Sequence, residues 1–363
     1  MRAFAFLLAI AFWPGAVSPA MTLRWAIMAV GAALLLLLLD GPRLSRWVAA
    51  AGAVFLIIVL GSVADVTDPL YGIDDGVHLL ALATVFCLGS ALDDLTPAWE
   101  GLALGVAISG LMALLQVLGF SLVEQVAHPA GLFMNKNFLA EAGVITVIPM
   151  LLLRRRWLLP ALFLAAVLPM SKGSLLALFV VSAMLWRKGR KIDAAALAGI
   201  TALVALTLVA LWALDLFPSQ THLGEYMLGV SSAASRFEFW RDAFGGLTWF
   251  GSGLSSFAGD FPRIGNAHSE PVQALYEFGV FALIPAGIAA YCWMEKDHYV
   301  EHLILAAIAV LCLFSFPLHM PVTGFAAALA LGHLAGARAR LRVPQHDGGM
   351  ARACHFDWQA HGR

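Results

Sequence analysis

Charged residues are scarce in this sequence, and their scarcity limits what the protein can be. Asp, Glu, Lys and Arg make up 12% of the 363 residues, about half of the roughly 25% found in soluble domains. An ordinary soluble enzyme is therefore excluded. Lys plus Arg (22) almost balance Asp plus Glu (23), which argues against a nucleic-acid binder. The four cysteines have no motif spacing, so they indicate neither a disulfide framework nor a zinc site.

Apolar residues are abundant instead, at 61% of the chain. Every backbone amide in lipid needs a partner within the chain, so a membrane chain must be helical or a closed barrel, and long Leu/Ala/Val runs favour helices. We predict an all-α, polytopic membrane bundle of about twelve spans. They lie at about 3–19, 24–40, 47–64, 77–93, 98–120, 137–153, 157–170, 173–186, 194–217, 270–293, 301–317 and 320–336.

The basic residues divide unequally between the two sides of this bundle. If residue 1 is cytoplasmic, 16 of the 22 cations face the cytoplasm and 6 face outward, as the positive-inside rule requires. The predicted parts are an N-terminal bundle of about nine spans (1–217), a periplasmic loop with a short amphipathic helix (218–269), C-terminal spans (270–336) and a flexible cytoplasmic tail (337–363). Residues 1–20 also fit a cleaved signal peptide.

The outer loop contains a predicted surface helix. Ser235 to Glu238 has the S-x-x-E form of a capping box, which predicts a helix start there. Phe237, Trp240, Arg241 and Phe244 then recur at helical spacing, as in a helix lying on the membrane with its aromatic side in lipid. Arg236, in the first turn, is either a functional cation or a snorkelling anchor.

His268 is expected at the outer mouth of the next span. Ser269 fits the N-cap and Pro271 the first turn of a helix. His268 could act as a general base near neutral pH or be a hydrogen-bonded structural residue. Glu277 lies nine residues further on, and is either functional or the partner of a buried polar group.

Two lysines complete the predicted outer group. Lys136 lies between Asn135 and Asn137 just before a span, where capping alone explains the asparagines. Lys172 lies in Ser171-Lys-Gly173 between two spans, where snorkelling is the alternative role. Lys136, Lys172, Arg236, Arg241 and His268 thus share one side, without the carboxylate pairs or His/Cys clusters of a metal site. Such a constellation suits a diphosphate, with no metal and no cofactor predicted.

Four blocks of the chain, in order, resemble the O-antigen ligase and O-antigen polymerase family of bacterial membrane glycosyltransferases. Gly131 to Ala140 resembles G-x-F-x-N-x-N-F-x-A, and Ser171-Lys-Gly173 resembles a Ser-Arg-Gly turn. Arg236 to Trp240 resembles R-x-x-x-W, followed by the G-x-G of Gly251 to Gly253. His268 to Gly279 resembles H-N-x-x-[L/V]-x-x-x-x-E-x-G, with serine instead of asparagine at 269.

The resemblance implies a GT-C-like helical fold in the bacterial inner membrane, with the active site facing the periplasm. It implies metal-independent, inverting transfer of a glycan from undecaprenyl diphosphate to a hydroxyl of lipid A-core or a similar acceptor. Arg236 and Lys172, aided by Lys136 and Arg241, would bind the diphosphate, and His268 would activate the hydroxyl. Asn135, Asn137, Trp240, Ser269 and Glu277 would support them.

Two departures and two alternatives accompany this interpretation. Lys172 replaces the family's arginine, which keeps the charge but loses the bidentate fork. This difference, together with serine instead of asparagine at position 269, leaves two possibilities open: an unusual acceptor or reduced activity. The sequence does not separate a ligase from a polymerase or a protein O-oligosaccharyltransferase. A transporter of a lipid-linked glycan also explains the outer cations.

Overall fold

The computed structural model describes residues 1–13, 18, 20–39, 41–63, 69–120, 129–213, 230–261 and 267–341. Over these residues the chain is all-helical, as predicted. The α-helices are α1 (Arg2–Ile10), α2 (Thr22–Leu37), α3 (Arg46–Ser62), α4 (Pro69–Ala91), α5 (Thr96–Val117), α6 (Lys136–Leu152), α7 (Leu159–Val167), α8 (Lys172–Arg187), α9 (Lys191–Ala213), α11 (Val230–Gly245), α12 (Ser256–Asp260), α13 (Glu270–Phe278), α14 (Leu283–Trp293), α15 (Tyr299–Cys312) and α16 (Pro321–Leu341). Short 3-10 turns are η2 (Gly131–Phe133), η3 (Arg156–Leu158), η4 (Gly279–Ala282) and η5 (Pro317–His319).

Three described helical segments are long and apolar enough to cross a membrane: Leu70–Ala91, Thr96–Val117 and Glu270–Trp293. Four shorter apolar helical segments accompany them, Thr22–Leu37, Arg46–Ser62, Arg156–Val167 and Tyr299–Cys312. The described part of the chain therefore has three candidate membrane spans by length and composition. The predicted number of twelve spans is not confirmed.

Among the described residues of the first predicted span, 3–19, helix is confined to α1, which has nine residues in all. A helix of that length covers about 13 Å, less than half of a bilayer core of about 30 Å. Arg24, at the start of the predicted span 24–40, is buried against the end of α1. Its guanidinium donates to the carbonyl oxygens of Ala9 (2.8 Å) and Leu132 (3.2 Å) and lies over the Phe133 ring. It thus satisfies a carbonyl that the end of a short helix leaves free.

Glycines allow α4 and α16 to pack backbone against backbone. A Cβ atom at Gly89 of α4 would overlap the Leu329 carbonyl oxygen, and one at Gly332 of α16 would overlap the Phe86 carbonyl oxygen. Small residues of this kind are typical of contacts between membrane helices, where close van der Waals packing replaces the hydrophobic effect.

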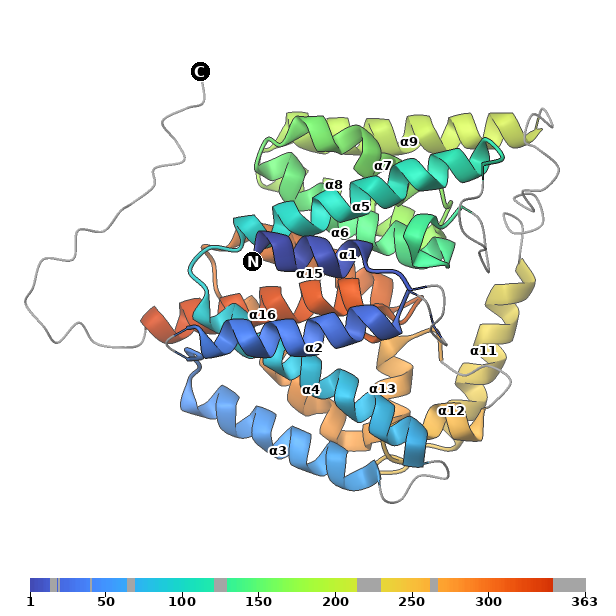
Figure 1. Cartoon of the computed structure of the whole chain (residues 1–363). Coiled ribbons are helices and arrows are strands. Elements are labelled where there is room, and N and C mark those ends of the chain that lie inside the picture. The colour runs from blue at the N-terminus through green and yellow to red at the C-terminus, as the bar shows by residue number, and fades with distance from the viewer. Residues whose placement is uncertain are drawn as a thin grey trace, which may run out of the picture.

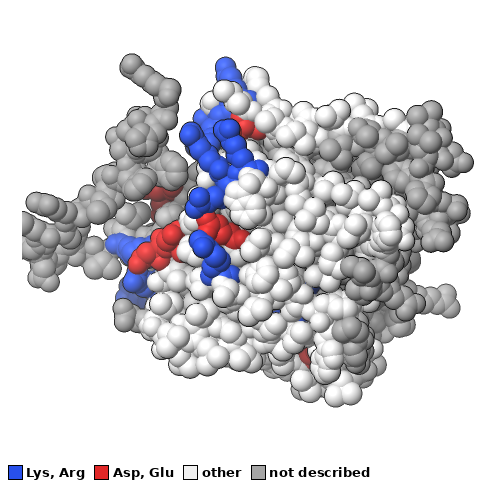
Figure 2. All heavy atoms as spheres, turned by 45° about the horizontal axis from the view of Figure 1, so that its top comes forward, with Lys and Arg blue, Asp and Glu red and all other residues white. Residues whose placement is uncertain are grey.

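Charged side chains gather at one end of the helices. Glu100 accepts hydrogen bonds from Arg2 and from Arg155 (2.7 Å), and Asp93 pairs with Arg43 (2.6 Å) and Arg340 (3.2 Å). On the face drawn in Figure 2, most of the visible charged side chains lie at this end, beside a broad uncharged area. All four arginines belong to the group predicted to face the cytoplasm.

The helix α11 lies across the opposite end of the bundle, far from the N-terminus (Figure 1). It begins at Val230, so the predicted start at Ser235 is wrong by about one turn and the capping box does not begin the helix. The tail boundary also shifts, because residues 337–341 form the last turn of α16. The rest of the predicted tail, 342–363, and residues 214–229 of the outer loop lie outside the described residues.

The contact between α4 and α16 can be tested with a leucine at Gly332. We expect Gly332→Leu to destabilise the protein by about 1–3 kcal/mol, since the added side chain forces the two backbones apart. The measurement is the midpoint of thermal unfolding in detergent, followed by fluorescence-detected size-exclusion chromatography. Gly287→Leu on α14 is the matched control, because a Cβ atom there meets open space. Equal midpoints for the two variants would contradict the close packing.

Candidate functional site

Four of the predicted site residues meet at one end of the bundle. Lys136 is the first residue of α6, and Lys172 is the first residue of α8. Arg236 lies in α11, and His268 lies two residues before α13. All four elements reach the same short segment, Phe314–Phe316, which joins α15 to η5.

Contacts with Phe314–Phe316 hold the four residues near each other. Arg236 Nη1 donates to the Phe314 carbonyl oxygen at 3.1 Å, and Gly173, next to Lys172, lies beside Phe314. The His268 ring lies 5.2 Å from the Phe316 ring, centroid to centroid. Phe138, two residues after Lys136, packs against Phe316 from another side at 5.6 Å. Residues from four separate parts of the sequence therefore surround one connecting segment.

Burial and neighbouring positive charge lower the pKa values of basic groups in this cluster. Burial lowers the pKa of Lys136, and the nearby charge of Lys172 lowers it further. Burial also lowers the pKa of Arg236. The pKa of His268 is below its usual 6.5, chiefly through burial and then through the charge of Arg236. An anion bound among these groups would relieve the repulsion, and the depressed pKa leaves His268 neutral near pH 7.

Two helix N-termini add to the positive potential of the site. Lys136 and Lys172 occupy the first position of α6 and α8, where unpaired backbone N–H groups and the helix dipole both favour negative charge. Asn135 is the N-cap of α6, and its side chain accepts a hydrogen bond from the Asn137 backbone N–H at 2.9 Å. The predicted cap is therefore confirmed, and it accounts for Asn135 without a ligand.

His268 has an unusual backbone conformation. Its φ is +51°, in the left-handed region that non-glycine residues rarely adopt. The predicted start of the following helix is confirmed, with Ser269 at the N-cap position and proline in the first turn of α13. The Ser269 side chain makes no capping hydrogen bond.

Trp240 fixes α11 next to His268. Its indole N–H donates to the carbonyl oxygen of Ala267 at 2.7 Å, and the ring packs against a small buried cluster that includes Phe257 and Tyr276. The aromatic side chains of α11 therefore do not all face the same surroundings. Trp240 faces the protein, whereas Phe237 and Phe244 are exposed, so the predicted single lipid-facing stripe is wrong for Trp240.

Arg241 is not brought into the cluster, although it was predicted to bind the diphosphate. Its side chain is 78% exposed and pairs with its neighbour Asp242 at 3.5 Å. Arg236 and Arg241 are five residues apart, so they leave the helix in different directions.

The glycine motifs have a structural explanation, since residues 249–253 pair with the end of α13. Ser252 N donates to Tyr276 O (2.9 Å), Gly253 N to Glu277 O (3.0 Å) and Val280 N to Trp249 O (2.9 Å). A Cβ atom at Gly251 would overlap the Glu277 carbonyl oxygen. The predicted span 270–293 is a candidate membrane span in the structure as well, but its regular α-helix is interrupted at Gly279, where φ is +52° and the short turn η4 begins.

Glu277 supports the site from within the protein. It is 3% exposed, and its carboxylate accepts a hydrogen bond from Gln273 Nε2 at 3.1 Å. Gln273 Oε1 in turn accepts from the backbone N–H of Ala267, the residue before His268, at 3.3 Å. Glu277 therefore belongs to a chain of contacts that ends beside His268.

An ion pair not anticipated from the sequence, between buried Glu270 and half-buried His319, lies behind the cluster. Glu270, the first residue of α13, accepts a hydrogen bond from Leu318 N at 2.7 Å and lies 3.2 Å from His319 Nδ1. Burial alone would lower the pKa of His319, but the negative charge and hydrogen bond of Glu270 outweigh it and raise the pKa to about 10. Both residues were on the predicted outer side, yet only the fold reveals their contact.

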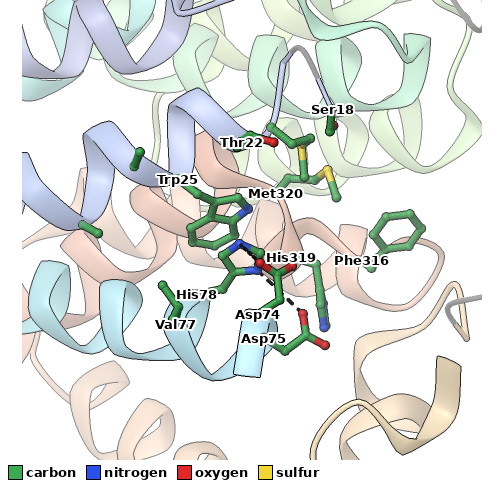
Figure 3. A pocket seen from close by; sticks show the side chains of 13 residues that line it. Ser18, Thr22, Trp25, Asp74, Asp75, Val77, His78, Phe316, His319 and Met320 are labelled. Atoms are coloured by element: carbon green, nitrogen blue, oxygen red, sulfur yellow. Dashed lines mark ion pairs between the residues drawn. The ribbon is translucent and has the colours of Figure 1, made fainter. Parts of the chain in front are cut away.

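Asp74, Asp75 and His78 form a second group missed in the sequence. One ligand atom of each lies within 4.8 Å of the others, a spacing that could hold a metal ion. Their i, i+1, i+4 spacing on α4 was the available signal, because it brings them to one side of a helix. With Trp25, Phe316 and His319 they line a cavity of about 470 Å³ (Figure 3).

A second cavity, of about 620 Å³, lies at the other end of the bundle. Its lining includes Asp93, Arg154 and Arg190. Although it is larger, it contains none of the residues predicted to act on a lipid diphosphate. Neither the protein-family models nor the curated proteins that were compared with this chain give a match.

The Glu270–His319 pair makes stability depend on pH. Since the folded-state pKa of His319 is raised from 6.5 to about 10, the pair contributes fully below pH 6.5 and loses its contribution as the pH rises towards 10. Wild-type protein should therefore melt higher than His319→Gln at about pH 6, by a margin that shrinks towards pH 10. A margin that does not change with pH would contradict a charged His319.

Proposed function

We propose that this protein is an O-antigen ligase-like glycosyltransferase of the bacterial inner membrane. It transfers a glycan from an undecaprenyl-diphosphate donor to a hydroxyl of lipid A-core or a similar acceptor, at the periplasmic face. The observation that carries the proposal is the meeting of Lys136, Lys172 and Arg236 with one neutral imidazole, His268, around Phe314–Phe316. The topology of about twelve spans with both termini in the cytoplasm belongs to the same proposal.

The cations have a defined task in this reaction. The bond from the anomeric carbon to the diphosphate oxygen breaks, and its electron pair remains on the diphosphate. Three positive side chains and two helix N-termini stabilise the charge that develops there. The protein thus supplies the neutralisation that a divalent cation supplies in other transferases.

His268 has the complementary task. The acceptor hydroxyl attacks the anomeric carbon from the side opposite the diphosphate, so the configuration inverts, and its proton passes to the imidazole. A base must be neutral to accept a proton, and the lowered pKa of His268 keeps it so at neutral pH. Its fixed backbone and the contact with Phe316 limit where the ring can point.

Replacing each group by alanine tests these roles with purified protein, a lipid-diphosphate donor and an acceptor lipid. His268→Ala should slow transfer by about 10²- to 10⁴-fold, which is the usual contribution of a general base. Arg236→Ala should slow it by about 10²- to 10³-fold, as the loss of one transition-state donor does. Arg241→Ala on the same helix is the matched control and should retain wild-type transfer. Undiminished transfer by His268→Ala at normal protein levels would remove the proposed base.

The charge of Arg236 should affect how the transfer rate depends on pH. The rate is expected to fall with decreasing pH as His268 becomes protonated, with a midpoint below pH 6.5. Removing the neighbouring positive charge favours the protonated imidazole, so Arg236→Gln should move this acid limb to higher pH. Arg241→Gln should leave the limb in place. An unmoved limb in Arg236→Gln would show that another group titrates.

The same assay separates the alternatives. A polymerase would join repeat units into a ladder of chain lengths, and a protein O-oligosaccharyltransferase would glycosylate a polypeptide. A transporter would yield no covalent product from purified protein. Stoichiometric product formed from the lipid-diphosphate donor would therefore exclude transport.

A further inference from the structure

The cavity beside His268 has no task in the mechanism so far. It lies between α2, α4 and the segment before α16, and its volume of about 470 Å³ is within the range of about 300–1,000 Å³ usual for small-ligand sites. Phe316 forms one of its walls and also contacts the His268 ring at 5.2 Å. The cavity and the cationic cluster are therefore neighbours, separated by one aromatic ring.

The cavity offers free hydrogen-bond acceptors. The Asp74 side chain is 71% exposed, and its closest ionisable neighbour, His78, is 3.8 Å away. Asp75 accepts a hydrogen bond from Ser255 Oγ at 2.5 Å and lies 3.6 Å from His78. A carboxylate has about four acceptor positions, so both side chains keep capacity for a ligand.

The cavity also contains a donor without a partner. Trp25 is 4% exposed, and its indole N–H has no hydrogen-bond partner among the described residues. Buried polar atoms of this kind are rare, and one beside a cavity indicates a missing acceptor. Figure 3 shows the Trp25 ring stacked on His78, across the cavity from Phe316. The stacking, at 4.1 Å between centroids, fixes the direction of the indole N–H.

These groups together select a class of ligand. A phosphate would be repelled by Asp74 and Asp75, and a bare metal ion would leave the Trp25 N–H unpaired. A hydroxyl group both donates and accepts, so neighbouring hydroxyls of one sugar ring can donate to the carboxylates and accept from the indole. The aromatic ring of Phe316 offers an apolar surface to the sugar's C–H groups.

We propose that this cavity binds the saccharide end of the acceptor, with Asp74, Asp75 and Trp25 as its hydroxyl-binding residues. This assignment rests on the proposed function. The donor diphosphate then lies on the Arg236 side of Phe314–Phe316 and the acceptor sugar on the Asp75 side. One hydroxyl of that sugar passes Phe316 to reach His268.

Two variants that spare the fold test the site. Asp74→Asn removes an exposed charge, and Trp25→Phe removes the N–H while keeping an aromatic ring. With rough lipopolysaccharide, which lacks O-polysaccharide, as acceptor, each should raise the acceptor KM about three- to tenfold, the effect of losing one hydrogen bond. The rate at saturating acceptor and the donor KM should stay at wild-type values. Asp297→Asn, which lines the cavity at the other end of the bundle, is the matched control.

A binding measurement keeps the two proposals distinguishable. Binding of rough lipopolysaccharide to His268→Ala protein should weaken by the same factor when Asp74→Asn or Trp25→Phe is added. If transfer proceeds but both variants keep the wild-type acceptor KM and binding, the acceptor site is overturned and the glycosyltransferase proposal stands. If no transfer occurs but Asp74-dependent binding persists, the proposed function fails and the saccharide site stands.

A measurement with calcium tests the other ligand that the cavity could bind, a metal ion. Acceptor binding should be the same in EDTA and in calcium. If it requires calcium, and Asp74→Asn abolishes calcium binding measured by calorimetry, the cavity is a cation site and the saccharide proposal is overturned.

Discussion

Confinement of charge to the ends of the helices is the constraint on which the rest of this structure depends. Lipid offers no partners for backbone or charge, so the region between the ends has to be helical and almost uncharged. At one end the arginines neutralise Glu100 and Asp93. At the other, Lys136, Lys172 and Arg236 come together near His268. Their burial, and the repulsion between Lys136 and Lys172 and between Arg236 and His268, make that end suited to an anion.

The segment Phe314–Phe316 organises that second end. Its Phe314 carbonyl accepts a hydrogen bond from Arg236, and its Phe316 ring contacts His268 and also lines the cavity that contains Asp74 and Asp75. The cationic cluster and a pair of carboxylates therefore both lie next to one short connection. In the proposed reaction, charge attracts the anionic donor to the cations, and hydrogen bonds to Asp74 and Asp75 hold the hydroxyl-bearing acceptor in the cavity. The Glu270–His319 pair links η5, which directly follows this segment, to α13.

Much of the local structure could be predicted from the sequence because it depends on neighbouring residues. Asn135 caps α6, and α13 begins directly after Ser269 with Pro271 in its first turn, since a cap and the fixed φ of proline both act within one turn. Longer-range details were less predictable. The start of α11 shifted from Ser235 to Val230, and Trp240 turned from lipid towards Ala267, because tertiary contacts override a pattern of apolar residues. The regular α-helix of the predicted span 270–293 is interrupted at Gly279, where residues 249–253 form backbone hydrogen bonds that leave no trace in hydropathy.

The sequence by itself indicated an all-helical chain with candidate membrane spans, and it singled out Lys136, Lys172, Arg236 and Arg241 among the few cations predicted to face outward. Both follow from composition and from the order of apolar runs, which act through solvation and need no knowledge of packing. Only the tertiary structure decided which of those cations meet. It brought Lys136, Lys172 and Arg236 to His268, left Arg241 outside, and revealed Glu270–His319 and the Trp25–His78 cavity. Electrostatic and hydrogen-bonding contacts act over a few ångströms, and the separation of residues along a chain does not specify that distance.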